Sequence, residues 1–192
     1  APGGWETMSR ALITKRNVRP EELAEAGLTS ARANGRGAYD KFRERIIFPI
    51  RDQAGQAVGL GGRILPPPKA EPSGASPADA AFTSAEPRGP KYLNSPATPL
   101  FDKSRTLYLI DKAKPAMRKD GSAILVEGYT DALMAHQSGF TNVVASMGTA
   151  LTPAQIALLL RYASKILLAY DVDSAGVKAG TFGAAELLKL VI

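Results

Sequence analysis

Four carboxylates in the second half of the chain have a spacing that suits a divalent cation. Glu127 directly follows the apolar run 124–126, and Asp131 comes four residues later. Asp171 and Asp173 follow a second apolar run, and alternate residues of an extended chain share one face. Bare carboxylates packed together repel one another and are costly to desolvate. Since hard cations such as Mg²⁺ bind carboxylate oxygens together with substrate phosphates, this pattern predicts a metal site.

The elements that would position these carboxylates alternate between strands and helices. Short apolar runs bounded by glycine predict buried strands, and the Ala- and Leu-rich runs after them predict helices. Such alternation implies right-handed crossovers and a parallel sheet, and ligands collect at the carboxyl ends of its strands. The expected elements are strands 123–127, 142–146 and 165–170, and helices 129–138, 153–162 and from 175 onward. If the first and last of these strands are neighbours, the four carboxylates converge at one edge.

The first part of the chain predicts a mixed helical and stranded subdomain. Pro20 and the two acids after it favour a helix start, and Gly27 favours its end. Pro49 places its strand at an edge or a bulge. Glycines in the next strand indicate either bulges, the simpler interpretation, or the close approach of another group. The expected elements are helices 5–15, 20–27 and 109–119, a loop over 32–40, a strand over 46–50, a turn over 53–56 and a returning strand over 57–65.

The composition divides the chain into two expected domains. Residues 1–121 would form a basic N-terminal subdomain, and residues 122–192 an α/β domain. Within the first, residues 66–89 are rich in Pro, Ala, Ser and Glu, and they cannot bury enough apolar surface to offset the entropy of ordering. This segment is therefore expected to be an exposed, partly disordered insertion. The first residues do not resemble a natural beginning and the final helix stops without a cap, so the chain is expected to be truncated at both ends.

Charge and composition exclude several classes of chemistry. The chain has no Cys and a single His, which excludes disulfides, thiol nucleophiles and histidine-based sites as a basis for catalysis. No stretch is long and apolar enough for a membrane span. The net charge is +6, with the basic excess in the first two thirds and an acidic excess after residue 120. This asymmetry suits a polyanionic partner steered toward cations, although an ordinary solvated surface explains the charge equally well.

Cations and aromatic residues alternate just after the insertion. Lys91, Asn94, Lys103 and Arg105 could contact phosphates, and the neighbouring tyrosines could stack on bases. A solvated basic loop with the aromatic rings in the core fits the same spacing. The segment therefore predicts a nucleic-acid interface without deciding between the two.

Taken together, the motifs resemble a known family. The single Glu of 126–131 and the Asp-x-Asp of 170–176 resemble the signature of Toprim domains, which occur in primases, topoisomerases and some nucleases. The front half narrows this resemblance to the RNA polymerase core of DnaG-type bacterial primases. Its matching segments are 43–50, 59–63, 91–96 and 103–108, together with 146–150.

The resemblance implies an α/β fold and a DNA-directed RNA polymerase that makes short primers on single-stranded DNA from NTPs. It implies that Glu127, Asp171 and Asp173 are catalytic and that these three and Asp131 hold Mg²⁺ or Mn²⁺. Zinc would belong only to a separate N-terminal domain, and a replicative helicase would bind through a C-terminal domain. The location implied is the bacterial cytoplasm, at the replisome. The implied nucleic-acid and nucleotide contacts are Arg43, Arg45, Arg63, Lys91, Asn94, Lys103 and Arg105.

The chain departs from the family pattern in three respects. It ends before a further acidic pair of the family, which leaves one metal position incomplete. The zinc-binding and helicase-binding domains are absent from it. Val172 and Thr130 stand where the family often has Gly and Met, and neither supplies a ligand.

Several residue roles stay open at this level. Glu127 is either a metal ligand or the group that accepts the hydroxyl proton, and Asp131 is either a metal-associated group or an acid that favours a helix start. His136 is expected to be structural, and Tyr129 and Tyr170 to be packing residues. Two other functions use the same residues, namely a Toprim nuclease or topoisomerase fragment and a non-catalytic nucleic-acid-binding scaffold.

Overall fold

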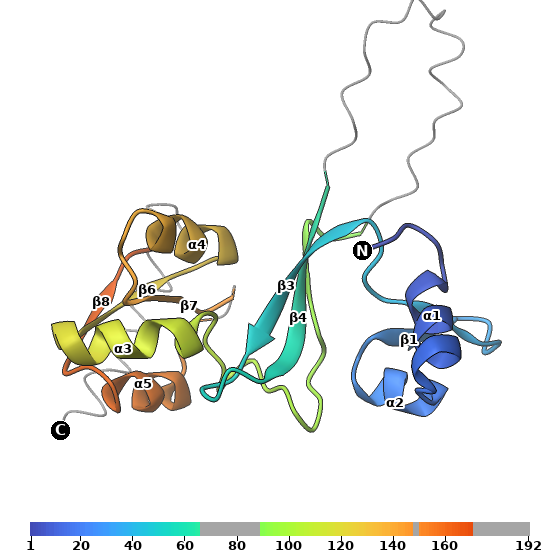
Figure 1. Cartoon of the computed structure of the whole chain (residues 1–192), viewed down its shortest axis with the longest axis horizontal. Helices are drawn as coiled ribbons and strands as arrows, with labels where there is room; N and C mark the ends of the chain where they lie inside the picture. Colours follow the sequence, from blue (N-terminus) through green and yellow to red (C-terminus); the bar gives the residue numbers. More distant parts are fainter. Residues whose placement is uncertain (66–88, 148–149, 171–192) are drawn as a thin grey trace, which may run out of the picture. The chain divides into compact units, whose positions relative to one another are not determined.

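A computed structural model describes residues 1–65, 89–147 and 150–170, and these form two compact units (Figure 1). The first unit comprises Ala1–Phe48 and Gly61–Ser95, and the second comprises Pro49–Leu60 and Pro96–Ile192. The boundary crosses two paired strands, β3 (Arg45–Arg51) and β4 (Ala57–Ile64), so that the tip of their hairpin belongs to the second unit. The predicted insertion up to residue 88, the helix from 175, Asp171 and Asp173 lie outside the described residues.

The first unit contains two short helices and small antiparallel sheets. Its helices and short strands are α1 (Thr7–Arg16), α2 (Pro20–Glu25), β1 (Thr29–Ala31), β2 (Ala38–Asp40) and β5 (Tyr92–Asn94). Strands β1 and β2 pair with each other, and β5 pairs with β4 in the order β3-β4-β5. Gly27 has φ 69° just after α2, and Pro49 lies on β3 at the edge of this described sheet, as predicted. The loop predicted over 32–40 is wrong at its end, because residues 38–40 pair as β2.

A buried carboxylate joins α1 to β2. Asp40 is 1% exposed, and its two oxygens accept hydrogen bonds from the backbone N–H groups of Met8 (2.6 Å) and Ser9 (3.0 Å). These are among the first N–H groups of α1, which have no partner inside the helix. The Glu6 side chain makes no capping bond, so Asp40 supplies the cap from 32 residues further along the chain.

Close packing, rather than bulges, explains two glycines of β4. A Cβ on Gly62 would lie 2.9 Å from the Phe42 ring and 3.0 Å from the Arg45 side chain. A Cβ on Gly59 would lie 3.0 Å from the Phe101 ring. Real Cβ atoms rarely approach so closely, so the strand lacks side chains where buried rings and the Arg45 stem cover it.

The second unit is built on a parallel sheet in the order β7-β6-β8, which confirms the predicted α/β fold. Figure 1 shows α4 on one side of this sheet and α3 and α5 on the other. The core between the sheet and the latter two helices includes Ile110, Met117, Leu125 and Ile156. The elements are α3 (Ile110–Asp120), β6 (Ser122–Val126), α4 (Tyr129–Gln137), β7 (Val143–Ala145), α5 (Pro153–Leu160) and β8 (Lys165–Leu168).

Local signals fix the ends of these elements. Gly121 has φ 63° and ends α3, and Thr152 forms a capping box with Gln155 at the start of α5. A ring nitrogen of His136 lies 2.8 Å from the Val143 carbonyl oxygen, which ties α4 to β7 and matches the structural role predicted for this histidine. No helix among the described residues has the length and apolar character needed to cross a membrane.

Candidate metal centre and nucleic-acid interface

At the carboxyl end of the parallel sheet, residues of the three strands lie side by side in two rows, one residue from each strand in each row. Leu125 pairs with Val144 on one side and with Leu168 on the other, and these three side chains belong to or pack against the core under α3 and α5. Two residues further along each strand are Ser146, Glu127 and Tyr170. The ladder continues beyond the first row, since Ser146 N–H donates to Val126 O (3.1 Å) and Ala169 N–H donates to Leu125 O (2.8 Å). Because alternate residues share a face, the second row lies on the same face.

Glu127 lies at the carboxyl end of the central strand, as predicted. Its Oε1 atom is buried and has no hydrogen-bond partner among the described residues. A buried carboxylate oxygen without a donor is costly, and a cation resolves that cost. Glu127 therefore fits the divalent-metal role that its position in the sequence predicts.

The Tyr170 hydroxyl oxygen is also buried without a hydrogen bond of ordinary geometry to the described residues. Burial, together with the negative charge of Glu127, raises the pKa of Tyr170 to about 12, although the nearby Ser146 side chain partly opposes this. The hydroxyl thus keeps its proton at neutral pH. Met147, directly after Ser146, is buried and has φ 62°, a conformation that few non-glycine residues adopt.

Asp131 is engaged at the start of α4. Its side chain is exposed and accepts a hydrogen bond from Gly128 N–H (3.0 Å), the N-cap residue of this helix. This geometry fits the helix-start alternative for Asp131, and its association with a metal stays a prediction. Within residues 1–65, 89–147 and 150–170, no three His, Cys, Asp or Glu side chains gather closely enough to hold an ion. Asp171 and Asp173 lie outside these ranges, so the predicted four-carboxylate cluster stays a prediction.

Packing accounts for the other tyrosines near this edge. Tyr108 and Tyr129 form an edge-to-face pair with ring centres 4.7 Å apart, and both are buried. Burial raises the pKa of both hydroxyls. Tyr129 therefore has the packing role that the sequence analysis expected.

A side chain of α5 anchors the backbone of the loop that carries Lys103 and Arg105. Gln155 is fully buried, and its Nε2 atom donates to Lys103 O (3.1 Å) and Thr106 O (3.0 Å). Lys103 is half-buried, and burial lowers its pKa, whereas Arg105 is exposed. This support leaves the Arg105 side chain in solvent on an anchored backbone.

In the first unit, Arg43 lies over an aromatic pair that the sequence analysis did not single out. Its guanidinium carbon is 4.0 Å from the centre of the Trp5 ring and 5.0 Å from that of Tyr39. The two rings meet edge to face at 5.7 Å, and Arg32 lies 5.5 Å from the Trp5 ring. We call these four residues the aromatic platform. The only signal in the sequence is that both aromatic residues stand beside Gly- or Arg-rich segments.

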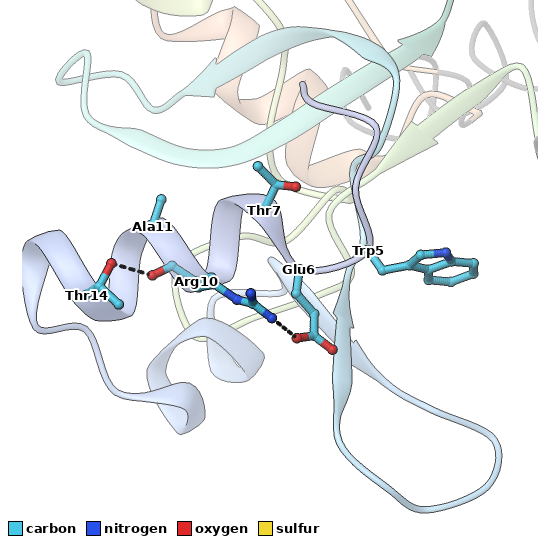
Figure 2. A pocket seen from close by; sticks show the side chains of 6 residues that line it. All are labelled: Trp5, Glu6, Thr7, Arg10, Ala11 and Thr14. Carbon is cyan, nitrogen blue, oxygen red and sulfur yellow. Dashed lines mark hydrogen bonds and ion pairs between the residues drawn. The ribbon is translucent and has the colours of Figure 1, made fainter.

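Three hollows adjoin the platform, and one of them, of about 560 Å³, is lined by all four platform residues. Figure 2 shows one of about 650 Å³ along α1, with the Trp5 ring at its end and the Glu6–Arg10 ion pair on its wall. Trp5 and Arg43 also line a cavity of about 460 Å³ together with Lys41. Trp5 is 50% exposed, so its ring is accessible from solvent.

The remaining predicted basic residues of this unit divide into two kinds. Arg45 is buried and donates to Pro90 O (2.8 Å), and burial lowers its pKa, so its guanidinium is used within the fold. Arg63 and Lys91 each lie 5.9 Å from the Tyr92 ring, and Asn94 follows on the same strand. The Nε atom of Arg63 is buried without a partner in the described structure. A phosphate contact therefore suits Arg63 and Lys91 better than Arg45.

Comparison with known families identifies both parts of the chain. Residues 1–114 match the family model of the DNA primase catalytic core, N-terminal domain, and residues 121–191 match that of the Toprim domain. The chain belongs to the DNA primase catalytic-core family. This confirms the resemblance to DnaG-type primases inferred from the motifs. The division at residues 121 and 122 stays a prediction, since the compact units interleave along the chain.

Individual primases support the same assignment. A DNA primase of Synechococcus elongatus is 41% identical over 189 residues, which are 97% of this chain and 24% of that protein. A crystal structure of the Aquifex aeolicus primase, with zinc-binding and RNA polymerase domains, has a TM-score of 0.77 at 34% identity and covers 97% of this chain and 41% of that one. A DnaG primase catalytic domain bound to ssDNA has a TM-score of 0.73 at 34% identity, covering 95% of this chain and 50% of that one. The chain thus spans about a quarter of the curated relative.

Proposed function

We propose that the protein carrying this chain is a DNA-directed RNA polymerase that makes short RNA primers on single-stranded DNA. Membership of the primase family and the buried, unpartnered Glu127 oxygen at the end of β6 support this proposal. The solved relative bound to single-stranded DNA supports the class of template. Glu127, Asp171 and Asp173 would carry the chemistry, and NTPs would be the substrates.

Nucleotidyl transfer joins the 3′-oxygen of the growing primer to the α-phosphorus of an incoming NTP and breaks the bond to the pyrophosphate. Glu127, Asp171 and Asp173 would hold divalent cations, and these would neutralise the pyrophosphate and activate the hydroxyl. Toprim domains and primases are generally metal-dependent, and Mg²⁺ or Mn²⁺ is the proposed ion. Zinc is proposed only for a separate domain, as the Aquifex aeolicus structure separates it.

The template would lie on the first unit. The aromatic platform offers an exposed Trp5 ring beside two guanidinium groups, and Arg63 and Lys91 add positive charge near Tyr92. Bases stack on aromatic faces while cations bind phosphates, which suits single strands of any sequence. We also propose the bacterial cytoplasm as location and a replicative helicase as partner of the whole protein.

Primer synthesis from labelled NTPs on single-stranded DNA with Mg²⁺ tests the proposal. Short RNA products are expected from the intact protein and should disappear with Asp171→Ala. Asp120→Ala, an exposed acid before β6, is the matched control and should leave synthesis unchanged. DNA cleavage without synthesis would point instead to a nuclease, and Mg²⁺-independent binding alone to a scaffold.

Titration of labelled single-stranded DNA tests the template surface separately. Trp5→Ala should weaken binding by about 1–3 kcal/mol, the usual value of one stacked base. Ile13→Ala, at another exposed apolar residue of the first unit, is the control and should bind normally. Equal binding by both variants would remove the platform from the template path.

A further inference from the structure

The row at the carboxyl edge contains a donor and an acceptor that complement each other. Glu127 presents a buried carboxylate oxygen and Tyr170 a buried hydroxyl, and neither has a hydrogen-bond partner among the described residues. Each lies two residues beyond the cross-strand pair Leu125 and Leu168, so both follow adjacent strands at the same register. Native structures seldom leave such groups unpaired, because each costs about 1–3 kcal/mol.

The surroundings of Tyr170 favour a role as donor. Its ring packs against the core under α3 and α5, which limits the positions that its hydroxyl can take. Ser146, which is 1% exposed, follows the third strand at the same level, and its side chain interacts with the Tyr170 hydroxyl, although no hydrogen bond of ordinary geometry joins the two.

We propose that Tyr170 is a positioning residue for Glu127, and that its hydroxyl donates a hydrogen bond to the Glu127 carboxylate when a divalent cation is bound. That bond would fix the orientation of the carboxylate that binds the cation. This inference rests on the proposed function, and it adds a role to the packing against the core that was expected of Tyr170. Partners of this kind orient metal ligands, and their removal typically lowers metal affinity 10–100-fold.

The chain offers a matched control at the other end of the same strand. Tyr162 precedes β8, whereas Tyr170 follows it, and the Tyr162 hydroxyl donates to Gln53 Oε1 at 2.7 Å. Both changes to Phe remove only a hydroxyl from a partly buried ring. Loss of a hydroxyl is thus compared at the two ends of one strand.

Mn²⁺ binding to the intact protein, followed by the electron paramagnetic resonance signal of free Mn²⁺, tests the inference. Tyr170→Phe should weaken binding about tenfold or more, and Tyr162→Phe should not change it. Glu127→Gln should weaken binding further, and adding Tyr170→Phe to it should have no additional effect. Unchanged Mn²⁺ affinity in Tyr170→Phe, or an equal loss in the Glu127→Gln background, would overturn the inference.

Two further measurements separate this result from the proposed function and from a folding defect. Primer synthesis by the wild type with unchanged Mn²⁺ affinity in Tyr170→Phe overturns the inference alone, whereas a wild type with neither synthesis nor Mn²⁺ binding overturns both. Without metal, Tyr170→Phe should lower the melting temperature less than Tyr162→Phe does, because only the Tyr162 hydroxyl makes a hydrogen bond of ordinary geometry among the described residues. A loss in Tyr170→Phe as large as that in Tyr162→Phe would contradict the premise.

Discussion

The polar side chains at the two ends of the parallel sheet differ in their hydrogen bonding. At the amino end, the Asn142 side chain donates to Ser122 O (3.1 Å) and Ser122 Oγ (3.2 Å), and Ser164 Oγ donates to Gly121 O (3.2 Å). At the carboxyl end, the buried Glu127 and Tyr170 atoms have no partner in the described structure. Buried polar groups are nearly always paired, so the unpaired atoms at the carboxyl end need an explanation, and a bound ion is one that fits the proposed function. We call the amino end, where these side chains are paired, the closed end of the sheet. The carboxyl end, with its unpaired Glu127 oxygen and Tyr170 hydroxyl, is the open end.

The largest effect is expected at the open end. Glu127→Gln should reduce primer synthesis by more than about 100-fold, since even groups beside a metal ligand cost 10–100-fold when removed. Its stability in the absence of metal should be unchanged or higher, because the change removes the charge from a carboxylate whose buried oxygen has no partner among the described residues. Urea unfolding and synthesis assays on the same preparation measure both. A large loss of stability would place Glu127 among the structural residues.

The closed end should respond in the opposite way. Asn142 is 7% exposed, and Asn142→Ala leaves the Ser122 groups without their donor. Its free energy of unfolding should fall by about 1–3 kcal/mol, while Mn²⁺ affinity stays the same. Thr141→Ala, at the exposed neighbouring residue, is the control for urea unfolding. A change in Mn²⁺ affinity with Asn142→Ala would break the distinction between the ends.

A smaller effect is expected at alkaline pH from Tyr108, which packs beside the open end. Burial, and then the Asp111 charge, raises the pKa of Tyr108 above its ordinary value near 10. The folded protein thus holds this proton more tightly than the unfolded chain. This contribution to stability is complete below about pH 10 and is lost as the pH rises through the folded-state pKa. Urea unfolding at pH 9 and above pH 10 should show a steeper loss for the wild type than for Tyr108→Phe.

The smallest effect is expected from Ser164→Ala at the closed end. Ser164 is exposed, and water replaces its hydroxyl at the Gly121 carbonyl. The free energy of unfolding should change by no more than about 0.5 kcal/mol, as for most surface substitutions. If Ser164→Ala lowered the free energy of unfolding as much as Asn142→Ala, then solvent exposure would not weaken the hydrogen bond from Ser164 to Gly121 O.

The strands and helices of the second unit were predictable because apolar runs alternate there and are bounded by clear signals. Thr152 and Gly121, for example, mark helix ends in the sequence and in the structure. The three-residue strands β1, β2 and β5 were missed because each mixes polar and apolar residues over too short a stretch to show a period, whereas the equally short β7 is an apolar run. Their pairing depends on contacts that no local pattern encodes.

The candidate site was predictable only in part, because contacts between strands are not encoded in any local pattern. Glu127 was placed correctly because the end of a buried strand is visible in the sequence. Its neighbours Ser146 and Tyr170 are set by the register of two other strands, and Tyr170 was expected to be a packing residue. The platform escaped prediction because Trp5 and Arg43 meet through the pairing of Asp40 N–H with Trp5 O, at 2.7 Å.

The cap that Asp40 provides to α1 has a consequence for the order in which the first unit can form. An isolated helix of ten residues is marginal in water, and this one lacks a cap from its own segment. During synthesis on a ribosome, α1 would gain its stabilising partner only after the chain has emerged past residue 40. The surface around Trp5 would then form together with the β1–β2 hairpin, in one cooperative step.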